Sequence, residues 1–249
     1  ALARSYAQQR VAFGAPLAQK PLHVDTLAWM QAETEAAFHL TFFLVELIGK
    51  DEAKVISEEE AHLLRLLTSL AKLTTGKQAV VVASEVLEAF GGAGYVEDTG
   101  LPLLLRDSQV LPIWEGTTNV LSLDALRALG RSGEPLQALA KEVNRCVQLA
   151  TDGRLQTAGT VAQTAVADAV HWLQTNLADP NALEAGARRF ALTLGRSLAL
   201  ARLVEQAQWS LDVEGDAHPR AAACRFGQTA VNQIQAIDPT DTALLAEGL

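Results

Sequence analysis

The chain contains few aromatic residues, few cysteines and a single methionine. Only 5% of its 249 residues are aromatic, and the two cysteines are Cys146 and Cys224. These lie far apart, without the spacing of zinc ligands and without a secretory leader at the start of the chain. A disulfide framework is therefore excluded, and we expect two free thiols in a reducing compartment.

Long apolar runs and an excess of basic residues are also absent. No run reaches the roughly 18 apolar residues that a membrane span needs. The net charge of −9 argues against a nucleic-acid surface over the whole chain, although a local basic strip stays possible. The five histidines are scattered, and none stands at zinc-ligand spacing from a Cys, Asp or Glu. We expect a cytoplasmic globular protein with no metal site and no membrane span.

What the chain does have is a strong helical pattern. Hydrophobic residues make up 49% of the sequence, enough for one large or two smaller domains. Apolar residues recur at helical spacing from about Val24 to Ile48. Ser57 and Glu60 form a capping box, which predicts the start of a helix that continues to about Phe90. Helices of this length are typical of helical bundles.

Glycine and proline are concentrated between the helical runs. Thr117 or Thr118 is a suitable N-cap for a further helix. The segment Gly-Arg-Ser-Gly-Glu-Pro at 130–135 is the predicted domain boundary. Beyond it, helices are expected at about 135–151, 158–178, 182–210 and 218–235. The sequence thus predicts an all-α fold, with an up-down helical bundle over residues 1–130 and a smaller helical extension over 131–249.

The start of the chain has no methionine and looks like the end of a helix. Its first ten residues, Ala-Leu-Ala-Arg-Ser-Tyr-Ala-Gln-Gln-Arg, are consistent with the closing turns of a helix that began earlier. We therefore expect the chain to be a fragment of a longer protein, with its first helix truncated.

Three short patterns follow one another along the chain. Arg-Val-Ala-Phe-Gly at 10–14 comes first, and Phe-Gly-Gly-Ala-Gly-Tyr at 90–95 follows at the end of the long predicted helix. Arg-Asp at 106–107 then leads to Trp-Glu-Gly-Thr-Thr-Asn at 114–119. Each pattern alone is explained by helix termination or capping. Their order and spacing together are specific.

In this order the patterns resemble the C-terminal helical domain of the acyl-CoA dehydrogenase flavoprotein family, over roughly residues 1–130. The tryptophan before Glu-Gly-Thr is similar to the branch that contains the bacterial alkylation-response flavoprotein. Residues beyond about 135 would match the extra helical region of that branch. The resemblance implies a bound FAD, an acyl-CoA thioester as substrate, and assembly into a homodimer or homotetramer. In the family, flavin and substrate lie between this helical domain and an upstream β-domain, whose segments do not appear in this sequence. We therefore expect the fragment alone to bind FAD weakly or not at all and to be inactive.

The resemblance implies that Glu115 is the catalytic base. It would remove the α-proton of the acyl thioester while the β-hydrogen leaves as hydride to the flavin. A carboxylate enclosed against Trp114 would lose solvation, which raises its pKa and makes it a stronger base when ionised. Two alternatives stay open: Glu115 as an ordinary residue near a helix N-terminus, and Trp114 as a core residue. Some family members place the base on an earlier helix, most of which is absent from this sequence.

The resemblance also implies a set of cofactor contacts. An arginine suits the FAD diphosphate because its donors form a rigid fork. The double glycine would approach the cofactor of a neighbouring subunit. The implied FAD-binding residues are Arg10, Phe13, Gly91, Gly92, Trp114, Thr117 and Asn119. Core packing, helix termination and capping are the competing explanations for these residues.

Two residues depart from the family pattern. Glu88 stands where many members have glutamine before the double glycine, and it adds a negative charge near a diphosphate. Pro21 stands where many members have glutamine in the second connector, and it cannot donate a backbone hydrogen bond. Both departures weaken the expected cofactor contacts in detail.

A second function would involve the helical extension. Four arginines fall on the helix predicted over 182–210: Arg188, Arg189, Arg196 and Arg202. Arg189 and Arg196 share one helix face, and the related alkylation-response protein is associated with DNA binding, so this strip could contact phosphates. The alternative function is therefore a tail that binds DNA or a protein partner, with little dehydrogenase activity. A solvated arginine face offset by Glu184 and Glu205, or a scaffold for oligomers, would also explain the helix.

Overall fold

The computed structural model describes residues 1–130 and 133–247. Within these ranges the regular secondary structure is helical apart from two strands of two residues each, which confirms the predicted all-α fold. The predicted boundary at 130–135 includes residues 131–132, which lie outside the described residues. No helix in the described ranges is long and apolar enough to cross a membrane.

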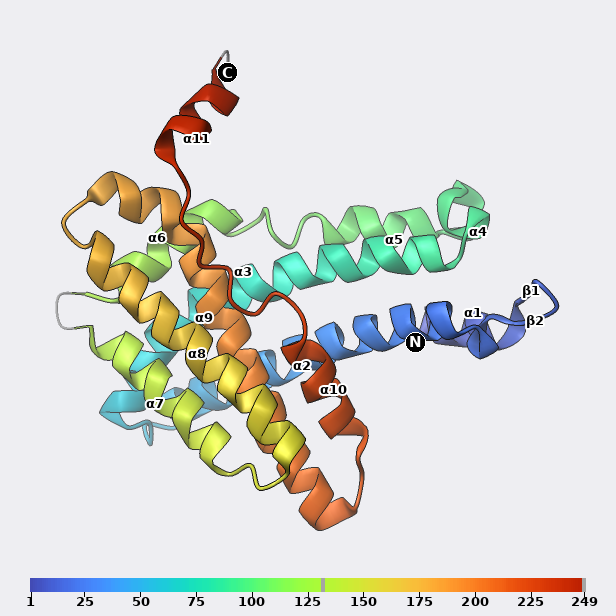
Figure 1. Cartoon of the computed structure of the whole chain (residues 1–249), viewed down its shortest axis with the longest axis horizontal. Helices are drawn as coiled ribbons and strands as arrows, with labels where there is room; N and C mark the ends of the chain where they lie inside the picture. Colours follow the sequence, from blue (N-terminus) through green and yellow to red (C-terminus); the bar gives the residue numbers. More distant parts are fainter. Residues whose placement is uncertain (131–132, 248–249) are drawn as a thin grey trace.

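Two helices of 32 residues, α2 (Pro21–Glu52) and α3 (Glu58–Ala89), run through the whole molecule (Figure 1). Proline is favourable at the first position of α2, where its missing N–H has no partner in any case. The predicted capping box at the start of α3 is confirmed. The Glu60 amide donates to Ser57 Oγ at 3.2 Å, and the Ser57 amide donates to the Glu60 carboxylate at 2.9 Å.

Short elements gather at the far end of the two long helices (Figure 1). These are α1 (Leu2–Gln9), the antiparallel strands β1 (Val11–Ala12) and β2 (Ala15–Pro16), η1 (Leu17–Gln19), α4 (Gly92–Tyr95), η2 (Glu97–Thr99) and α5 (Leu101–Ser108). Tyr6 of α1 stacks on Phe90 at the end of α3, with ring centroids 4.4 Å apart. This contact holds the first pattern of the sequence beside the second.

The remaining helices form the body of the molecule. They are α6 (Thr118–Ala128), α7 (Glu134–Gln148), α8 (Gly153–Asn176), α9 (Pro180–Trp209) with a π-helical end η3 (Ser210–Glu214), α10 (His218–Gly227) and α11 (Pro239–Ala246). Helix α9 is central, because it packs against α2, α3, α6, α7, α8 and α10. Its Leu194, Leu198 and Leu203 are fully buried.

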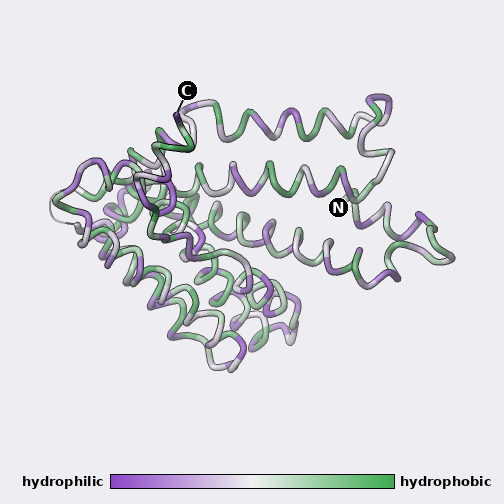
Figure 2. Tube along the Cα trace, turned by 45° about the horizontal axis from the view of Figure 1, so that its top comes forward, coloured by the Kyte–Doolittle hydropathy of each residue, from purple (hydrophilic) through white to green (hydrophobic). Residues whose placement is uncertain are grey.

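The two sequence regions share one hydrophobic core. Buried apolar residues of α2, α3 and α6 belong to the same cluster as those of α7, α8, α9 and α10. Figure 2 shows hydrophobic and hydrophilic residues alternating along these helices, as expected for amphipathic packing. Helix α11 projects away from the body (Figure 1) and has no buried residue.

The prediction of a helix over 218–235 is wrong for its second half. Helix α10 ends at Gly227, and residues 230–238 form no helix. Two side chains hold this segment in another path: Thr193 Oγ1 of α9 accepts from the Gln233 amide at 2.9 Å, and Asn232 donates to Asp168 of α8 at 2.6 Å. Bonds from side chains to backbone compete with helix formation, and here they come from distant parts of the chain.

A glycine at the centre of α9 allows its close contact with α3. A Cβ atom at Gly195 would lie 2.1 Å from Thr74 Oγ1, and Thr74 is itself buried. We expect Gly195→Ala to lower the free energy of unfolding by about 1–3 kcal/mol, because overpacking forces the two helices apart. Chemical denaturation measures this change.

Gly49 provides the matched control, because it is also helical but nothing lies within 4 Å of an added Cβ. Gly49→Ala should be neutral or stabilising by up to about 1 kcal/mol. Equal effects of the two substitutions would contradict the close α3–α9 contact.

Candidate active site and cofactor contacts

Glu115 lies in the loop between α5 and α6, where it lines a pocket between α2 and α3. The pocket has a volume of about 510 Å³. Its lining is largely apolar and includes Ala37, Ala79, Val82, Ala83, Leu111 and Trp114. A carboxylate thus stands beside an apolar wall, which is an arrangement suited to proton transfer from a largely apolar ligand.

The backbone of Glu115 adopts an unusual conformation. Among the described residues, three that are not glycine have a positive φ: Phe13 at 51°, Lys54 at 58° and Glu115 at 53°. Such a conformation costs on the order of 1 kcal/mol and persists only where neighbouring groups hold it. Two of the three are residues that the sequence patterns had singled out, Phe13 and Glu115.

Lys72 of α3 binds the backbone of the loop that carries Glu115. Its ammonium donates to the carbonyl oxygens of Trp114 and Gly116, each at 2.6 Å. One turn further along α3, Gly76 lets the loop approach, since an added Cβ would lie 3.4 Å from the backbone of Leu111. Sequence reasoning missed Lys72, because backbone carbonyls are its partners and no side-chain pattern marks such a contact.

Next to this loop, an ion pair and a hydrogen bond link α3 to α6. Arg65 donates to both oxygens of Asp124, each at 3.0 Å, and Ser69 donates to the same carboxylate. The hydrogen bonds from Arg65 and then Ser69 lower the pKa of Asp124 to about 2. Thr117 caps α6 as predicted, since its hydroxyl accepts from the Val120 amide. The loop that carries Glu115 is therefore anchored at both of its ends.

Within the described residues, Glu115 is not enclosed against Trp114. Glu115 is exposed, and Trp114 is 53% exposed, so Trp114 is not a core residue. Thr117 and Asn119 are also exposed. Within this chain the carboxylate of Glu115 is therefore open to solvent, and its role as a base stays a prediction.

A second group of predicted residues meets at the far end of α3. Arg10, Gly91 and Gly92 line a cavity of about 440 Å³ together with His23 and Glu88. His23 Nε2 is buried and has no hydrogen-bond partner among the described residues. The Arg10 side chain also makes no hydrogen bond or ion pair within the described chain. Nothing lies within 4 Å of an added Cβ at Gly91 or Gly92, so the backbone here is open to a ligand. Together with the donors of Arg10 and His23, it suits an anionic group, which the negative charge of Glu88 would repel.

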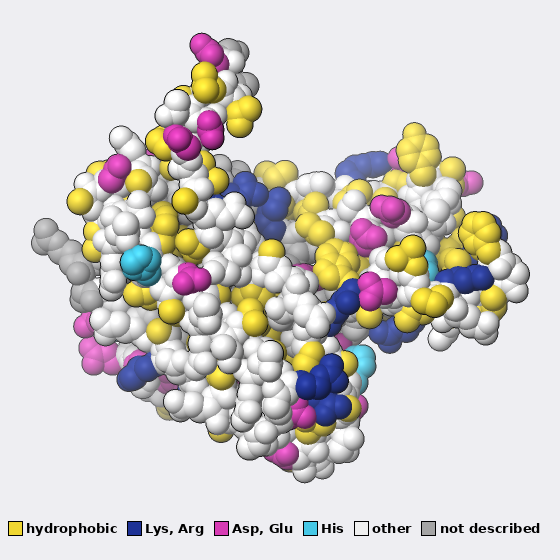
Figure 3. Space-filling model, viewed as in Figure 1, with side chains coloured by type: hydrophobic (Ala, Val, Ile, Leu, Met, Phe, Trp, Pro, Cys, Tyr) yellow, Lys and Arg dark blue, Asp and Glu magenta, His cyan; other side chains and the backbone are white. Residues whose placement is uncertain are grey.

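The two groups of predicted residues do not form one site within the chain. Lys72 and Glu88 are both on α3, and their 16-residue separation corresponds to about 24 Å along a helix. Phe13 belongs to neither pocket: it is 95% exposed at the turn of the β1–β2 hairpin. Figure 3 shows hydrophobic side chains gathered at this end of the molecule. They include Leu22 and Tyr95, both strongly exposed.

The proposed arginine strip on α9 is not formed. Arg196 is only 11% exposed, and it donates to both oxygens of Glu33 at 2.7 and 3.2 Å. Arg202 binds Glu142 and Glu205, at 2.9 and 2.6 Å. Because α9 packs on nearly all sides, these two arginines point at acidic partners inside the molecule, whereas Arg188 is exposed. Arg196 is therefore unavailable to a phosphate, which removes one of the two residues expected to bind DNA.

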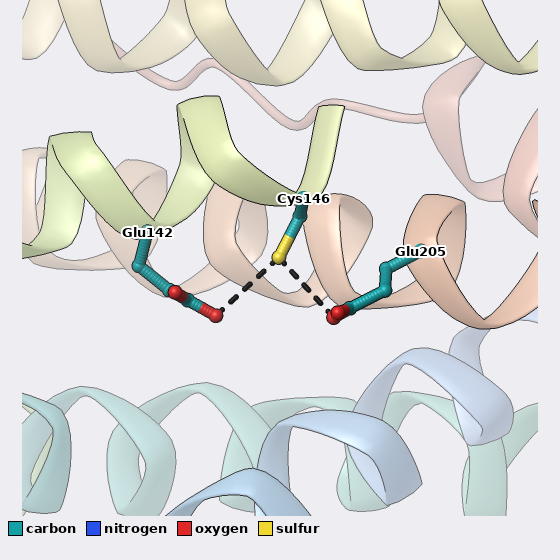
Figure 4. Close-up of side chains that lie close together, drawn as sticks. All are labelled: Glu142, Cys146 and Glu205. Carbon is teal, nitrogen blue, oxygen red and sulfur yellow. Dashed lines mark hydrogen bonds between the residues drawn. The ribbon is translucent and has the colours of Figure 1, made fainter. Parts of the chain in front are cut away.

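Cys146 lies between two carboxylates, as Figure 4 shows. Its Sγ is 3.4 Å from oxygens of Glu142 and of Glu205. Burial, and then the charges of Glu142 and Glu205, raise the pKa of the thiol. Arg145 and Arg202 bind both carboxylates, so the cluster is a neutralised ion-pair network. Both cysteines are free, as predicted.

Family models match nearly the whole chain. A model described as acyl-CoA dehydrogenase, C-terminal domain, matches residues 1–130. A second model, described as acyl-CoA dehydrogenase 11 C-terminal domain-like, matches residues 134–241. The chain therefore belongs to the acyl-CoA dehydrogenase family, which confirms the resemblance drawn from the three sequence patterns.

Two curated relatives are similar to different lengths of the chain. Acyl-CoA dehydrogenase family member 11 of Caenorhabditis elegans is 41% identical over 212 residues, which cover 83% of this chain and 34% of that protein. Putative acyl-CoA dehydrogenase AidB of Escherichia coli is 37% identical over 130 residues, or 52% of this chain and 23% of that protein. The chain thus spans about a third or less of these relatives.

Solved structures show the same fold. The crystal structure of C. elegans ACDH-11 in complex with C11-CoA superposes with a TM-score of 0.90 at 35% identity, over 99% of this chain and 44% of that one. An acyl-CoA dehydrogenase from Bacillus anthracis, complexed with FAD, gives a TM-score of 0.67 at 20% identity, over 98% of this chain and 48% of that one. The second likeness concerns the fold alone.

The tie between Asp124 and Arg65 should make stability depend on pH. The folded pKa of Asp124 is about 2, below the value of about 3.9 in an unfolded chain. The stabilisation is therefore complete above about pH 4 and is lost as the pH falls towards 2. Because Arg65 is half exposed, we expect Asp124→Asn to lower the free energy of unfolding by only about 1 kcal/mol at pH 7.

Thermal unfolding of the original and variant chains between pH 2 and pH 7 measures this difference. Asp98→Asn is the control, since Asp98 is exposed and makes no hydrogen bond or ion pair within the described chain. A difference for Asp124→Asn that stays constant down to pH 2 would refute the assignment.

Proposed function

We propose that the chain is the C-terminal helical part of an FAD-dependent acyl-CoA dehydrogenase. Membership of the family supports this class of reaction. The observation that carries the proposal is Glu115, held at a positive φ beside an apolar pocket by two hydrogen bonds from Lys72. Local strain of this kind is concentrated at functional sites.

The proposed role of Glu115 is that of general base. Its carboxylate takes the proton from the α-carbon of an acyl thioester, and the electrons of that C–H bond form the new double bond to the β-carbon. FAD, when bound, supplies the acceptor for the hydride that leaves the β-carbon. A bound ligand that covers the exposed carboxylate would remove water from it and so strengthen it as a base. Trp114 would form one apolar wall of the site.

The proposed substrate is an acyl-CoA thioester. The C. elegans relative binds C11-CoA, as the description of its structure states. Here the alanines of α2 and α3 beside Glu115 offer an apolar surface, which suits a hydrocarbon chain or a flavin ring. Thr117 and Asn119, exposed at the start of α6, are proposed to contact the flavin nucleotide.

The proposed diphosphate contacts are Arg10 and the Gly91–Gly92 turn, with His23 as an additional donor. Charged and unpartnered donors beside open backbone suit a diphosphate. Because this cavity lies about 24 Å along α3 from the Glu115 loop, we propose that it serves the cofactor of a neighbouring subunit in a homodimer or homotetramer. Phe13, strained and exposed at the hairpin turn, is proposed to pack against that subunit or its cofactor.

Glu115→Gln should abolish most flavin reduction. In the full-length protein loaded with FAD and mixed anaerobically with a panel of acyl-CoAs, we expect the reduction rate to fall by about 10²–10⁴-fold, because the general base is lost. Flavin absorbance measures the rate. Glu97→Gln, on the exposed η2 turn, should leave it unchanged. If the unmodified protein reduces its flavin with none of the acyl-CoAs, the dehydrogenase proposal fails.

Glu88→Gln should tighten FAD binding. The substitution removes a negative charge from the cavity that contains Arg10 and the double glycine. We expect a several-fold lower dissociation constant, and the gain should shrink as salt is added, because charge repulsion is screened. Arg10→Gln should weaken binding in the same assay. An unchanged affinity in both variants would show that this cavity does not bind the cofactor diphosphate.

A further inference from the structure

Lys72 binds the backbone around Glu115 and Gly116, the two residues of the active-site loop that have a positive φ. Its ammonium binds the carbonyl before Glu115, that of Trp114, and the carbonyl after it, that of Gly116, both at 2.6 Å. Between these carbonyls, Glu115 and Gly116 have φ values of 53° and 112°. We propose that Lys72 is a positioning residue, which fixes the direction of the Glu115 carboxylate. The inference rests on the proposed function of Glu115 as base.

Lysine is chemically suited to this task. Its ammonium has three donors and can bind two carbonyls that diverge, and a charged donor makes bonds about twice as strong as a neutral one. The Trp114 carbonyl belongs to the peptide plane that defines φ of Glu115. Holding this carbonyl therefore holds the left-handed conformation, which a glutamate would otherwise leave for an ordinary one.

Among the described residues, the Lys72 side chain donates hydrogen bonds only to this loop. Among the described residues no carboxylate pairs with Lys72, although the chain has an excess of acidic residues. It also lines the pocket beside Glu115, so its two bonds are made at the site itself.

The packing of α3 against α6 does not depend on Lys72. Arg65 and Ser69 bind Asp124 independently of it, and Gly76 contacts the start of the loop. Arg65, Ser69, Lys72 and Gly76 follow one another at spacings of three or four residues, so they lie on one face of α3. Removal of the ammonium should therefore release residues 114–116 while the helices stay in place.

The test compares three variants of the full-length protein loaded with FAD. Lys72→Met keeps the length of the side chain but has no donor, and Lys72→Arg restores a charged donor. Lys77→Met, on the same helix but without a bond to the loop, is the matched control. We expect Lys72→Met to lower kcat for flavin reduction by about 10–100-fold, with KM within about twofold, since displacement of a catalytic group impairs the chemical step. Lys72→Arg should recover part of the loss, and Lys77→Met should behave as the original protein.

Amide hydrogen exchange on the same samples identifies the cause. The proposal predicts faster exchange over residues 109–117 in Lys72→Met, with unchanged protection in α3 and α6. A Lys72→Met protein with the original kcat would overturn it. So would a fall in kcat together with lost protection in α6, which would indicate a merely structural role. If the unmodified protein reduces no flavin, the function of Glu115 fails, and exchange over 109–117 still shows whether Lys72 holds the loop.

Discussion

A buried ion pair between Glu33 of α2 and Arg196 of α9 fixes how the two regions of this chain meet across their shared core. Arg196 donates to both oxygens of Glu33, and Gln78 of α3 donates to the same carboxylate at 2.8 Å. The guanidinium also lies 4.6 Å from the ring centroid of Phe226 in α10. A buried charge without its partner costs several kcal/mol. Four helices therefore have to meet in one arrangement, and the rest of the fold is built around that meeting point.

Helix α3 transmits this arrangement to the candidate active site. Glu33 and Gln78 line the same pocket as Glu115, so the ion pair fixes the pocket wall. From the same helix Lys72 holds the loop, and Gln78 lies less than two turns further along. A site supported by one rigid helix is placed more precisely than a site formed by loops alone. Because α3 supports the loop from the protein side, the loop can keep its positive-φ conformation although its other side is exposed to solvent.

Local interactions were predictable, and distant ones were not. The capping box of Ser57 and Glu60 and the cap at Thr117 involve residues within one helical turn, so the sequence pattern contains the whole interaction. The end of α10 depends instead on a bond between Thr193 and Gln233, far apart in the sequence. For the same reason, helical periodicity alone suggested a basic strip on α9, whereas the structure pairs Arg196 with Glu33 of α2 and Arg202 with Glu142 of α7.

The sequence alone determined the all-α fold, the family, and the positions of the three patterns that carry Arg10, Gly91 and Glu115. These follow from helical periodicity, from capping and from the order of short motifs, all of which are written along the chain. Only the tertiary structure brought Arg10 beside Gly91, separated them from Glu115 by the length of α3, and placed Lys72 under the loop. The physical reason is that these contacts join backbone groups and side chains far apart in the sequence, whose meeting is decided by the packing of α3.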